Sequence, residues 1–331
     1  MSSKPTLVAT VTGANGFVGS HLCERLIDLG YQVRAIVRSS SNTKYLDALP
    51  LDIIRCGLLD APALEEAVRG SSHIYHLAGT TKALTEAGYM EGNVENTRRV
   101  MEACLVNPAI KKVVVTSSLA ASHPSRDLSP AKEEDPSEPL SAYGRSKVAQ
   151  EKLSYSYSDR IPVTVVRPPV IFGARDTEMY MLFQMVNSGL ISKVGFQKKY
   201  ISVIYIDDLV NGLIMAAEAE AAVGETFFLG SKKAYSYGEF STAIAQALNK
   251  KTLSISVPHW ALYGIAAISE LYFKLKNEPA TLSREKYKEM TQPGWICSSE
   301  KAERLLGFKE AFDLQQAVDI TVQWYKENKW L

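Results

Sequence analysis

The stretch Thr12-Gly13-Ala14-Asn15-Gly16-Phe17-Val18-Gly19 decides the fold. An apolar run over residues 7–11 precedes it and a helical pattern over 17–29 follows it, which is the order strand, glycine turn, helix. The first glycine permits a tight turn, the second lets backbone N–H groups approach a pyrophosphate, and the third packs the helix against the strand. Because a helix N-terminus favours anions, the stretch predicts a dinucleotide site. The alternative is a structural turn in another α/β protein, since glycine turns are common.

Strand and helix patterns alternate after this stretch. Apolar runs at 33–37, 52–54, 73–77, 112–116 and 163–166 predict strands. Residues 63–68, with Asp60 as N-cap, and residues 93–106 and 141–157 predict helices. The alternation predicts an α/β fold, a doubly wound parallel (Rossmann) sheet with helices on both faces.

The pattern loosens after residue 170. We predict helices over 179–187 and 207–217, a strand over 203–206 that returns to the main sheet, and a short strand over 226–229. Helices then dominate, over 238–248, 258–275, 299–306 and 314–324. We therefore expect a dinucleotide-binding domain over 1–172, with 201–230 returning to it, and a smaller, mainly helical substrate lobe over 173–200 and 231–331.

The composition is that of an ordinary globular protein. Of 331 residues, 46% are hydrophobic and 22% charged, and the net charge of +1 implies neither nucleic acid nor an anionic membrane as a partner. The four cysteines form no C-x-x-C pair, which predicts reduced thiols and no metal site. Residues 1–5 are polar, which argues against a signal peptide, and Glu270 and Lys274 interrupt the apolar stretch 260–275. We expect a cytoplasmic protein with no membrane span.

A Y-x-x-x-K pattern, Tyr143 with Lys147, lies on the helix predicted over 141–157. Residues four apart share a helix face, so the ammonium is expected beside the phenol, where it lowers the tyrosine pKa. Tyr143 then exchanges a proton near neutral pH, and Lys147 also holds ribose hydroxyls. Alone the pattern is weak, because many helices contain it by chance. Its position after the glycine turn and after a strand ending in serines strengthens it.

The strand over 112–116 leads into Ser117 and Ser118. Ligands lie at the carboxyl ends of strands in open α/β sheets, and a hydroxyl there can donate to a substrate carbonyl oxygen. We assign this role to Ser118 and a turn-capping role to Thr116 and Ser117.

Taken in order, these motifs resemble the extended short-chain dehydrogenase/reductase superfamily over nearly the whole chain. Further matching stretches are His76-Leu77-Ala78-Gly79, Asn93-Val94-Glu95-Asn96-Thr97, 167–173, 205–209, 299–308 and Trp324-Tyr325. The resemblance implies catalysis by Ser118, Tyr143 and Lys147 with support from Asn93, and a homodimer through a four-helix bundle near 95–106 and 141–157. It also implies a cofactor cleft formed by Gly13, Asn15, Gly16, Phe17, Val18, Gly19, Leu77, Ala78, Gly79, Thr81, Tyr143, Lys147, Pro168, Pro169 and Val170.

The sequence departs from the family's pattern at two places. Gly57-Leu58 stands where the family usually has Gly-Asp, so the aspartate contact with the adenine amino group is absent and the backbone of Leu59 is left to reach adenine. Asn96 replaces a glycine, a change that we interpret as structural.

The end of the second predicted strand indicates which cofactor binds. NAD-binding members carry an acidic residue there, which bonds the ribose 2′-hydroxyl. Here Arg38 occupies that position, followed by Ser39 and then Lys44. Because arginine pairs bidentately with phosphate, we expect NADP rather than NAD, against the alternative of an exposed loop arginine.

Other polar residues receive structural interpretations. His76 ends a predicted strand and is expected to be structural, whereas His123 either faces substrate or lies on the surface. The acidic run 133–135 is interpreted as a solvated loop. Asp207 and Asp208 are expected to cap a helix and compensate its dipole.

Together these features favour an NADP(H)-dependent oxidoreductase that interconverts a secondary alcohol and a ketone on a small-molecule substrate, similar to the dihydroflavonol-reductase and 3β-hydroxysteroid-dehydrogenase branch. One alternative is a nucleotide-sugar epimerase or dehydratase. The other is a non-catalytic NADP-binding protein, and such relatives typically lack the catalytic tyrosine and lysine. Epimerases usually carry a diphosphate-clamping arginine where Ile201 stands here, although Lys198 and Lys199 lie just upstream.

The helix predicted over 258–275 indicates the kind of substrate. About half of its large apolar side chains are expected to pack in the core and the rest to line a cleft for a bulky hydrophobic molecule. These side chains are Trp260, Leu262, Tyr263, Ile265, Ile268, Leu271, Tyr272 and Phe273.

Overall fold

The computed structural model describes residues 7–331, so the stretch 1–5, where we predict no signal peptide, lies outside the described residues. One sheet of seven parallel strands has the order β11-β6-β5-β4-β1-β2-β3. Its strands are β1 (Val8–Thr12), β2 (Gln32–Ile36), β3 (Asp52–Ile54), β4 (His73–His76), β5 (Lys112–Thr116), β6 (Val163–Arg167) and β11 (Thr226–Phe228). The predicted doubly wound parallel sheet is confirmed.

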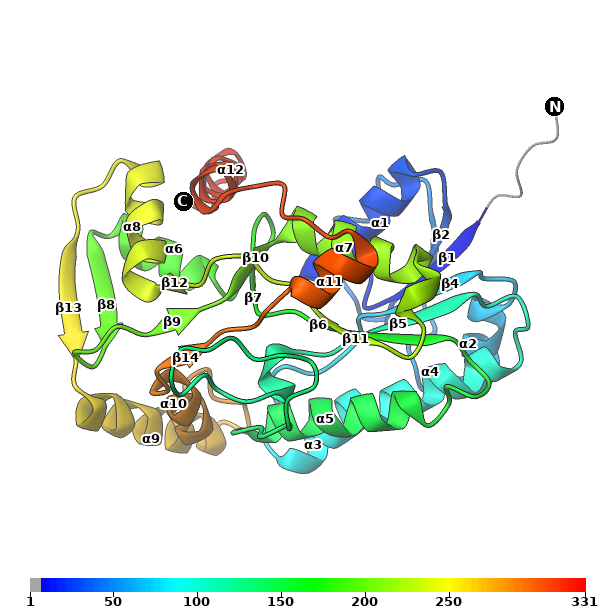
Figure 1. Ribbon diagram of the computed structural model, residues 1–331, viewed down its shortest axis with the longest axis horizontal. Helices are drawn as coiled ribbons and strands as arrows, with labels where there is room; N and C mark the ends of the chain where they lie inside the picture. The colour runs from blue at the N-terminus through cyan, green and yellow to red at the C-terminus, as the bar shows by residue number, and fades with distance from the viewer. Residues whose placement is uncertain (1–6) are drawn as a thin grey trace.

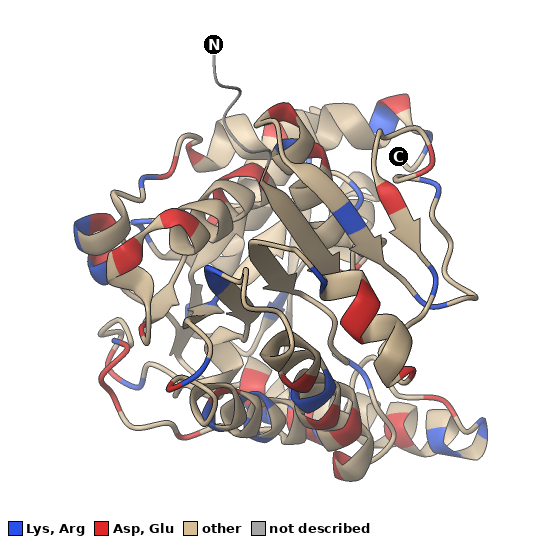
Figure 2. Ribbon diagram, turned by 90° about the vertical axis from the view of Figure 1, so that its right-hand side faces the viewer, with Lys and Arg blue, Asp and Glu red and all other residues tan. Residues whose placement is uncertain are grey.

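Helices cover both faces of this sheet (Figure 1). One face carries α1 (Phe17–Asp28) and α7 (Ile206–Glu218), and the other carries α2 (Ala61–Val68), α4 (Asn96–Leu105) and α5 (Ala142–Tyr155). On β5, Val113 and Val115 pack in the cluster with α2 and α4, whereas Val114 packs in the cluster with α1 and α7. A strand buried on both faces needs consecutive apolar residues, which explains the three valines. Figure 2 shows charges of both signs spread over the helices, in keeping with the net charge of +1.

Strand β10 (Val203–Tyr205) does not return to the main sheet, so that prediction is wrong. It pairs in parallel with β7 (Val170–Phe172) in a separate two-stranded sheet. Pro168 and Pro169, which lack backbone N–H groups, follow β6, and the chain resumes as β7 outside the main ladder. The edge position beside β6 is taken by β11.

The lobe predicted to be mainly helical also contains short strands. β8 (Leu190–Val194) pairs with β13 (Leu253–Val257), and β9 (Tyr200–Ile201) lies between β12 (Tyr235–Ser236) and β14 (Gly294–Trp295). The helices are α6 (Tyr180–Asn187), α8 (Tyr237–Leu248), α9 (His259–Leu275), α10 (Arg284–Met290), α11 (Glu300–Leu306) and α12 (Leu314–Glu327). Of these, α10 was not predicted. The division of the chain into a dinucleotide-binding domain and a substrate lobe stays a prediction.

Candidate active site

The glycine turn connects β1 to α1. Gly13 has a φ of +69°, and a Cβ there would lie 2.8 Å from the backbone nitrogen of Ala78. A Cβ on Gly19 would overlap the Gly13 carbonyl group, so a glycine lets the helix pack against the turn. Gly16 is exposed, and as the N-cap of α1 it leaves the first N–H groups without a side-chain partner. The turn thus offers free N–H groups at a positive helix end, which fits a pyrophosphate.

The carboxyl ends of parallel strands bring the predicted cleft residues to one edge of the sheet. Asn15, Phe17 and Val18 follow β1, residues 77–81 follow β4, Ser118 follows β5, and residues 168–170 follow β6. A Cβ on Gly79 would lie 2.9 Å from Oδ1 of Asn93 and 3.8 Å from Nζ of Lys147. The Leu119 N–H donates to the Pro168 carbonyl oxygen at 2.9 Å. The glycine turn and the Tyr143 helix therefore border the same edge.

The loop after β2 carries an exposed Arg38, and Ser39, Lys44 and Leu59 are exposed as well. The Arg55 guanidinium donates to the backbone carbonyls of Ser39, at 3.4 Å, and Ser41, at 3.2 Å. The Ser41 hydroxyl is buried without a hydrogen-bond partner among the described residues. Two guanidinium groups and an unpartnered hydroxyl fit a phosphate group here. Sequence reasoning missed Arg55 because it follows β3, and only the pairing of β2 with β3 brings it to this loop.

Tyr143 and Lys147 lie on the first two turns of α5, which Ser141 caps by accepting from the Gly144 N–H. Lys147 is buried, and its Nζ donates to the Thr116 carbonyl oxygen at 2.7 Å. Burial lowers the pKa of Lys147 to about 8 and raises the pKa of Tyr143 to about 12, a rise that the Ser118 hydroxyl partly offsets. The predicted lowering of the tyrosine pKa by the lysine is therefore wrong for the protein alone, because loss of water around the phenol outweighs the nearby charges.

Ser118 is the N-cap of a short 3-10 helix, η2 (Leu119–Ala121), and its Oγ accepts from the Ala120 N–H at 3.2 Å. The capping role predicted for Thr116 and Ser117 is wrong, because Ser117 instead donates to Glu151. The Thr116 hydroxyl is buried and has no hydrogen-bond partner in the described part of the chain. Since Ser118 accepts the capping bond, its own proton remains available to donate.

Asn93 lies in a π-helical turn, η1 (Glu91–Glu95), between α3 (Glu86–Met90) and α4, so the helix begins earlier than predicted. The buried Asn93 amide donates to the Ser146 hydroxyl at 2.9 Å and accepts from the Thr80 N–H at 2.7 Å. Ser146 in turn donates to the Tyr143 carbonyl oxygen at 2.7 Å. Such π turns frequently occur at functional sites. Asn93 thus holds the loop after β4 against the first turn of α5.

Glu151 and Arg167 form a buried ion pair that the sequence did not reveal. The guanidinium donates to both carboxylate oxygens, at 2.8 and 2.6 Å, and each side chain is 7% exposed. The Glu151 charge raises the pKa of Lys147 and so opposes the effect of burial. The pair links β6 to α5 one helical turn after Lys147.

Helix α10 contacts the beginning of α5, next to Tyr143. Glu285 accepts from the Ala142 N–H at 2.9 Å, and Glu289 accepts from the Ser141 hydroxyl at 2.6 Å. The Lys286 charge lowers the pKa of Tyr143, and the Glu289 charge raises it. This seven-residue helix, too short for a clear apolar period, brings charged groups that sequence reasoning missed.

The two histidines singled out from the sequence have polar partners. His76 is buried between the hydroxyls of Thr12 and Thr97, each at 2.8 Å, and burial lowers its pKa to about 3, so its structural role is confirmed. His123 lies 3.2 Å from the Asp135 carboxylate.

The acidic residues differ in part from expectation. Glu133 is not solvated: its carboxylate accepts from the Phe228 N–H at 2.8 Å, and burial raises its pKa. Asp207 and Asp208 lie in the first turn of α7, where a carboxylate compensates the dipole, but neither caps the helix. Asp208 instead accepts from the Ala311 N–H at 2.8 Å and so holds the C-terminal segment.

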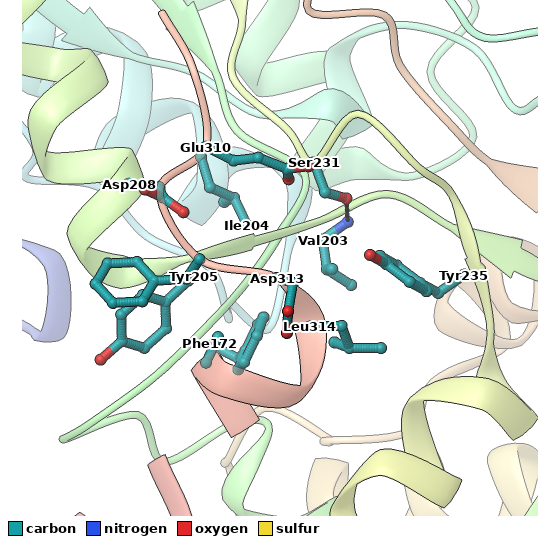
Figure 3. A pocket seen from close by; sticks show the side chains of 12 residues that line it. Phe172, Val203, Ile204, Tyr205, Asp208, Ser231, Tyr235, Glu310, Asp313 and Leu314 are labelled. Carbon is teal, nitrogen blue, oxygen red and sulfur yellow. Dashed lines mark hydrogen bonds between the residues drawn. The ribbon is translucent and has the colours of Figure 1, made fainter. Parts of the chain in front are cut away.

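A small hollow lies beside β10 and the segment 310–317, away from the predicted site residues (Figure 3). Asp208, Glu310 and Asp313 contribute carboxylates to its wall, and the Val203 N–H donates to the Ser231 hydroxyl at 3.5 Å. None of Ser118, Tyr143 and Lys147 lines it. The hollow is a small gap where the C-terminal segment packs beside β10.

Comparisons with known proteins agree with this geometry. The family model "NAD dependent epimerase/dehydratase family" matches residues 9–230. The chain is 27% identical over 324 residues to a ceramide reductase of Caulobacter vibrioides, covering 98% of this chain and 96% of that protein. It is 24% identical over 332 residues to a decarboxylating sterol-4-alpha-carboxylate 3-dehydrogenase of Mus musculus, and the match covers 95% of this chain and 90% of that protein. Its fold matches a UDP-glucuronic acid 4-epimerase of Bacillus cereus, solved with UDP-glucuronic acid and NAD, with a TM-score of 0.77, 20% identity, and coverage of 97% and 100%.

Proposed function

The chain belongs to the NAD dependent epimerase/dehydratase family, and from this premise we propose that it is an NADP(H)-dependent oxidoreductase that interconverts a secondary alcohol and a ketone. The observation that carries the proposal is the convergence of Ser118, Tyr143 and Lys147 at the sheet edge that the glycine turn also borders. A bound nicotinamide dinucleotide would supply or accept the hydride there.

The chain's own residues handle the proton and the substrate oxygen. The Ser118 hydroxyl, which accepts from the Ala120 N–H, donates to the substrate oxygen, and Tyr143 transfers the proton. A phenol with a pKa of about 12 is protonated at neutral pH, which suits proton donation to a ketone oxygen. Lys147 keeps one N–H on Thr116 and has two others for ribose hydroxyls.

The loop after β2 supports NADP as the cofactor. Arg38 is exposed just after β2, where the resemblance implies the residue that meets the ribose 2′ group, and Arg55 holds the loop backbone from the end of β3. The unpartnered Ser41 hydroxyl offers a further donor to a phosphate.

A bulky hydrophobic substrate is favoured over a nucleotide sugar. The two relatives named above bear the names of a lipid reductase and a sterol dehydrogenase. Ile201 is buried, and Lys199 donates to the carbonyl oxygens of Thr291 and Gln292, so neither is free to clamp a diphosphate. Lys198 remains exposed. The epimerase alternative therefore has one cation in this run, and the presence of Tyr143 and Lys147 argues against a non-catalytic protein.

A paired binding and turnover experiment tests the proposal. Purified protein is screened by thermal shift with NADPH or NADH, and then with NADPH plus steroid ketones, 3-oxo-lipids, or UDP- and dTDP-sugars. We expect NADPH to stabilise more than NADH, and a hydrophobic ketone to stabilise further and to be reduced with loss of NADPH absorbance. Stabilisation by a nucleotide sugar without net NADPH consumption would favour the epimerase.

We also propose that the chain forms a homodimer through α4 and α5 of each copy, and that residues 173–200 and 231–331 form the substrate lobe. Light scattering on the purified protein measures its oligomeric state, and we expect a dimer that survives dilution.

A further inference from the structure

Helix α9 exposes a continuous apolar stripe. Of its 17 residues, only Leu262 and Ala266 are buried, so the expectation that about half of its large apolar side chains pack in the core is wrong. Trp260, Ile268 and Leu271 are 80%, 71% and 61% exposed, and Leu275 is 81% exposed. With about 100° per residue, these four positions fall on one helix face, opposite Leu262 and Ala266. The stripe therefore points away from the protein.

Positive charge borders this stripe. On the same helical projection Lys274 borders the apolar face, and the exposed Lys276 follows the last residue of α9. Glu270 lies closer to the protein side, where its carboxylate is paired with Arg284 at 2.9 Å. From the start of α9 to residue 278 the chain carries Lys274, Lys276, Glu270 and Glu278. Because Glu270 is paired with Arg284, two lysines and one glutamate remain around the end of the stripe. Tyr263 and Tyr272, both about half exposed, lie towards the borders.

The loop between β8 and β9 extends the surface at the beginning of α9. The Gly195 N–H donates to the Val257 carbonyl oxygen at 2.8 Å, and Gly195 lies so close to the His259 ring that a Cβ would overlap it. The next residue, Phe196, is 84% exposed, and Lys198 is also exposed.

We propose that α9 docks the protein on the surface of an anionic lipid bilayer, with its apolar stripe in the interface and Lys274 and Lys276 at the headgroups. An apolar face bordered by lysines and aromatic rings is the pattern of helices that lie in the plane of a membrane. No helix within residues 7–331 is long and apolar enough to cross one. A second copy on the same patch would bring the lysine-rich borders together, which disfavours that occupant. The net charge of +1 does not reveal the patch, because acidic residues elsewhere balance it.

Docking there would place the candidate cleft close to the lipid. In Figure 1, α9 lies at the lower edge of the molecule beside α10. Arg284 on α10 holds α9 through Glu270, and Glu285 on α10 accepts from the Ala142 N–H, next to Tyr143. The helix pair therefore connects the proposed membrane surface to the first turn of α5.

Co-sedimentation with vesicles tests the proposal without cofactor or substrate, so its failure leaves the proposed oxidoreductase activity untouched. The full-length protein is mixed with vesicles of phosphatidylcholine alone or of phosphatidylcholine with phosphatidylglycerol. We expect binding to the mixed vesicles, weakened by salt, and little binding to phosphatidylcholine alone. The double variant Ile268→Ser, Leu271→Ser should lower the partition coefficient at least ~10-fold. Lys274→Glu with Lys276→Glu should abolish the preference for anionic vesicles.

Matched controls separate docking from unfolding and from self-association. Met181→Ser changes a side chain of similar exposure, 58%, on α6 and should bind like wild type. Circular dichroism checks that each variant is folded. The proposal is overturned if the wild-type protein does not bind the mixed vesicles, or if the Ile268→Ser, Leu271→Ser variant binds them as well as wild type does. It is also overturned if wild type does not bind and light scattering shows a dimer that this variant dissociates.

Discussion

Replacing Glu151 by Gln tests whether the buried ion pair supports the candidate site. The carboxylate accepts two hydrogen bonds from Arg167, at 2.8 and 2.6 Å, and one from Ser117 at 2.5 Å, with both charged side chains 7% exposed. Glu151→Gln keeps the shape but leaves the guanidinium charge buried without a counter-charge. Removing one partner of such a pair costs about 3–5 kcal/mol of folding free energy.

Urea unfolding followed by circular dichroism measures this loss, and an exposed pair provides the control. Arg126 and Glu138 lie 2.7 Å apart with side chains 76% and 54% exposed, so Glu138→Gln should cost less than ~1 kcal/mol. Because the Glu151 charge raises the pKa of Lys147, its removal should also move the alkaline limb of the pH–rate profile to lower pH. If Glu151→Gln were as stable as Glu138→Gln and the profile did not move, the reasoning would fail.

Three further variants address the cofactor, the core and the positioning network. Arg38→Asp should raise the dissociation constant of NADPH at least ~30-fold while NADH changes little, because a charge-assisted bond becomes a repulsion; equal weakening of both in titration calorimetry would contradict the assignment. Burial lowers the pKa of His76 from 6.5 to about 3, so His76 is neutral in the folded protein. In the unfolded chain the side chain binds a proton below pH 6.5, so the free energy of unfolding decreases as the pH falls from 6.5 towards 3. His76→Gln should flatten that decline by up to about 1.4 kcal/mol per pH unit in urea unfolding, and an unchanged slope would refute the burial argument. Asn93→Ala, which removes one hydrogen bond from the Ser146 hydroxyl and one from the Thr80 N–H, should lower unfolding free energy by about 1–3 kcal/mol and reduce kcat more than it raises KM; the reverse split would show that Asn93 binds substrate.

The glycine turn and the parallel sheet were predictable because their signals are local. Gly13 needs a positive φ, and the three valines of β5 face two cores, so both features leave a mark at consecutive positions. Strand β10 was assigned correctly as a strand but to the wrong sheet, since pairing with β7 follows from the chain's path after Pro168.

The electrostatics of the site were not predictable because they depend on burial. Tyr143 and Lys147 were identified by spacing, yet burial shifts both pKa values in the direction that disfavours charge. Arg55 reaches the loop after β2 through strand pairing, and Glu151 on α5 meets Arg167 at the end of β6. The exposed face of α9 has the apolar composition of a core helix, so only its position in the fold distinguishes it.

The most direct test of the proposed function is Tyr143→Phe, compared with wild type for both NADPH binding and turnover of a ketone that wild type reduces. Titration calorimetry should give a dissociation constant within a few-fold of wild type, because the phenol hydroxyl is assigned to the proton and not to the cofactor. Turnover should fall at least ~100-fold, the usual scale for a positioned acid–base group. Lys147→Met should weaken NADPH binding and also lower turnover. A Tyr143→Phe protein that binds NADPH normally and retains most of its turnover would contradict the account.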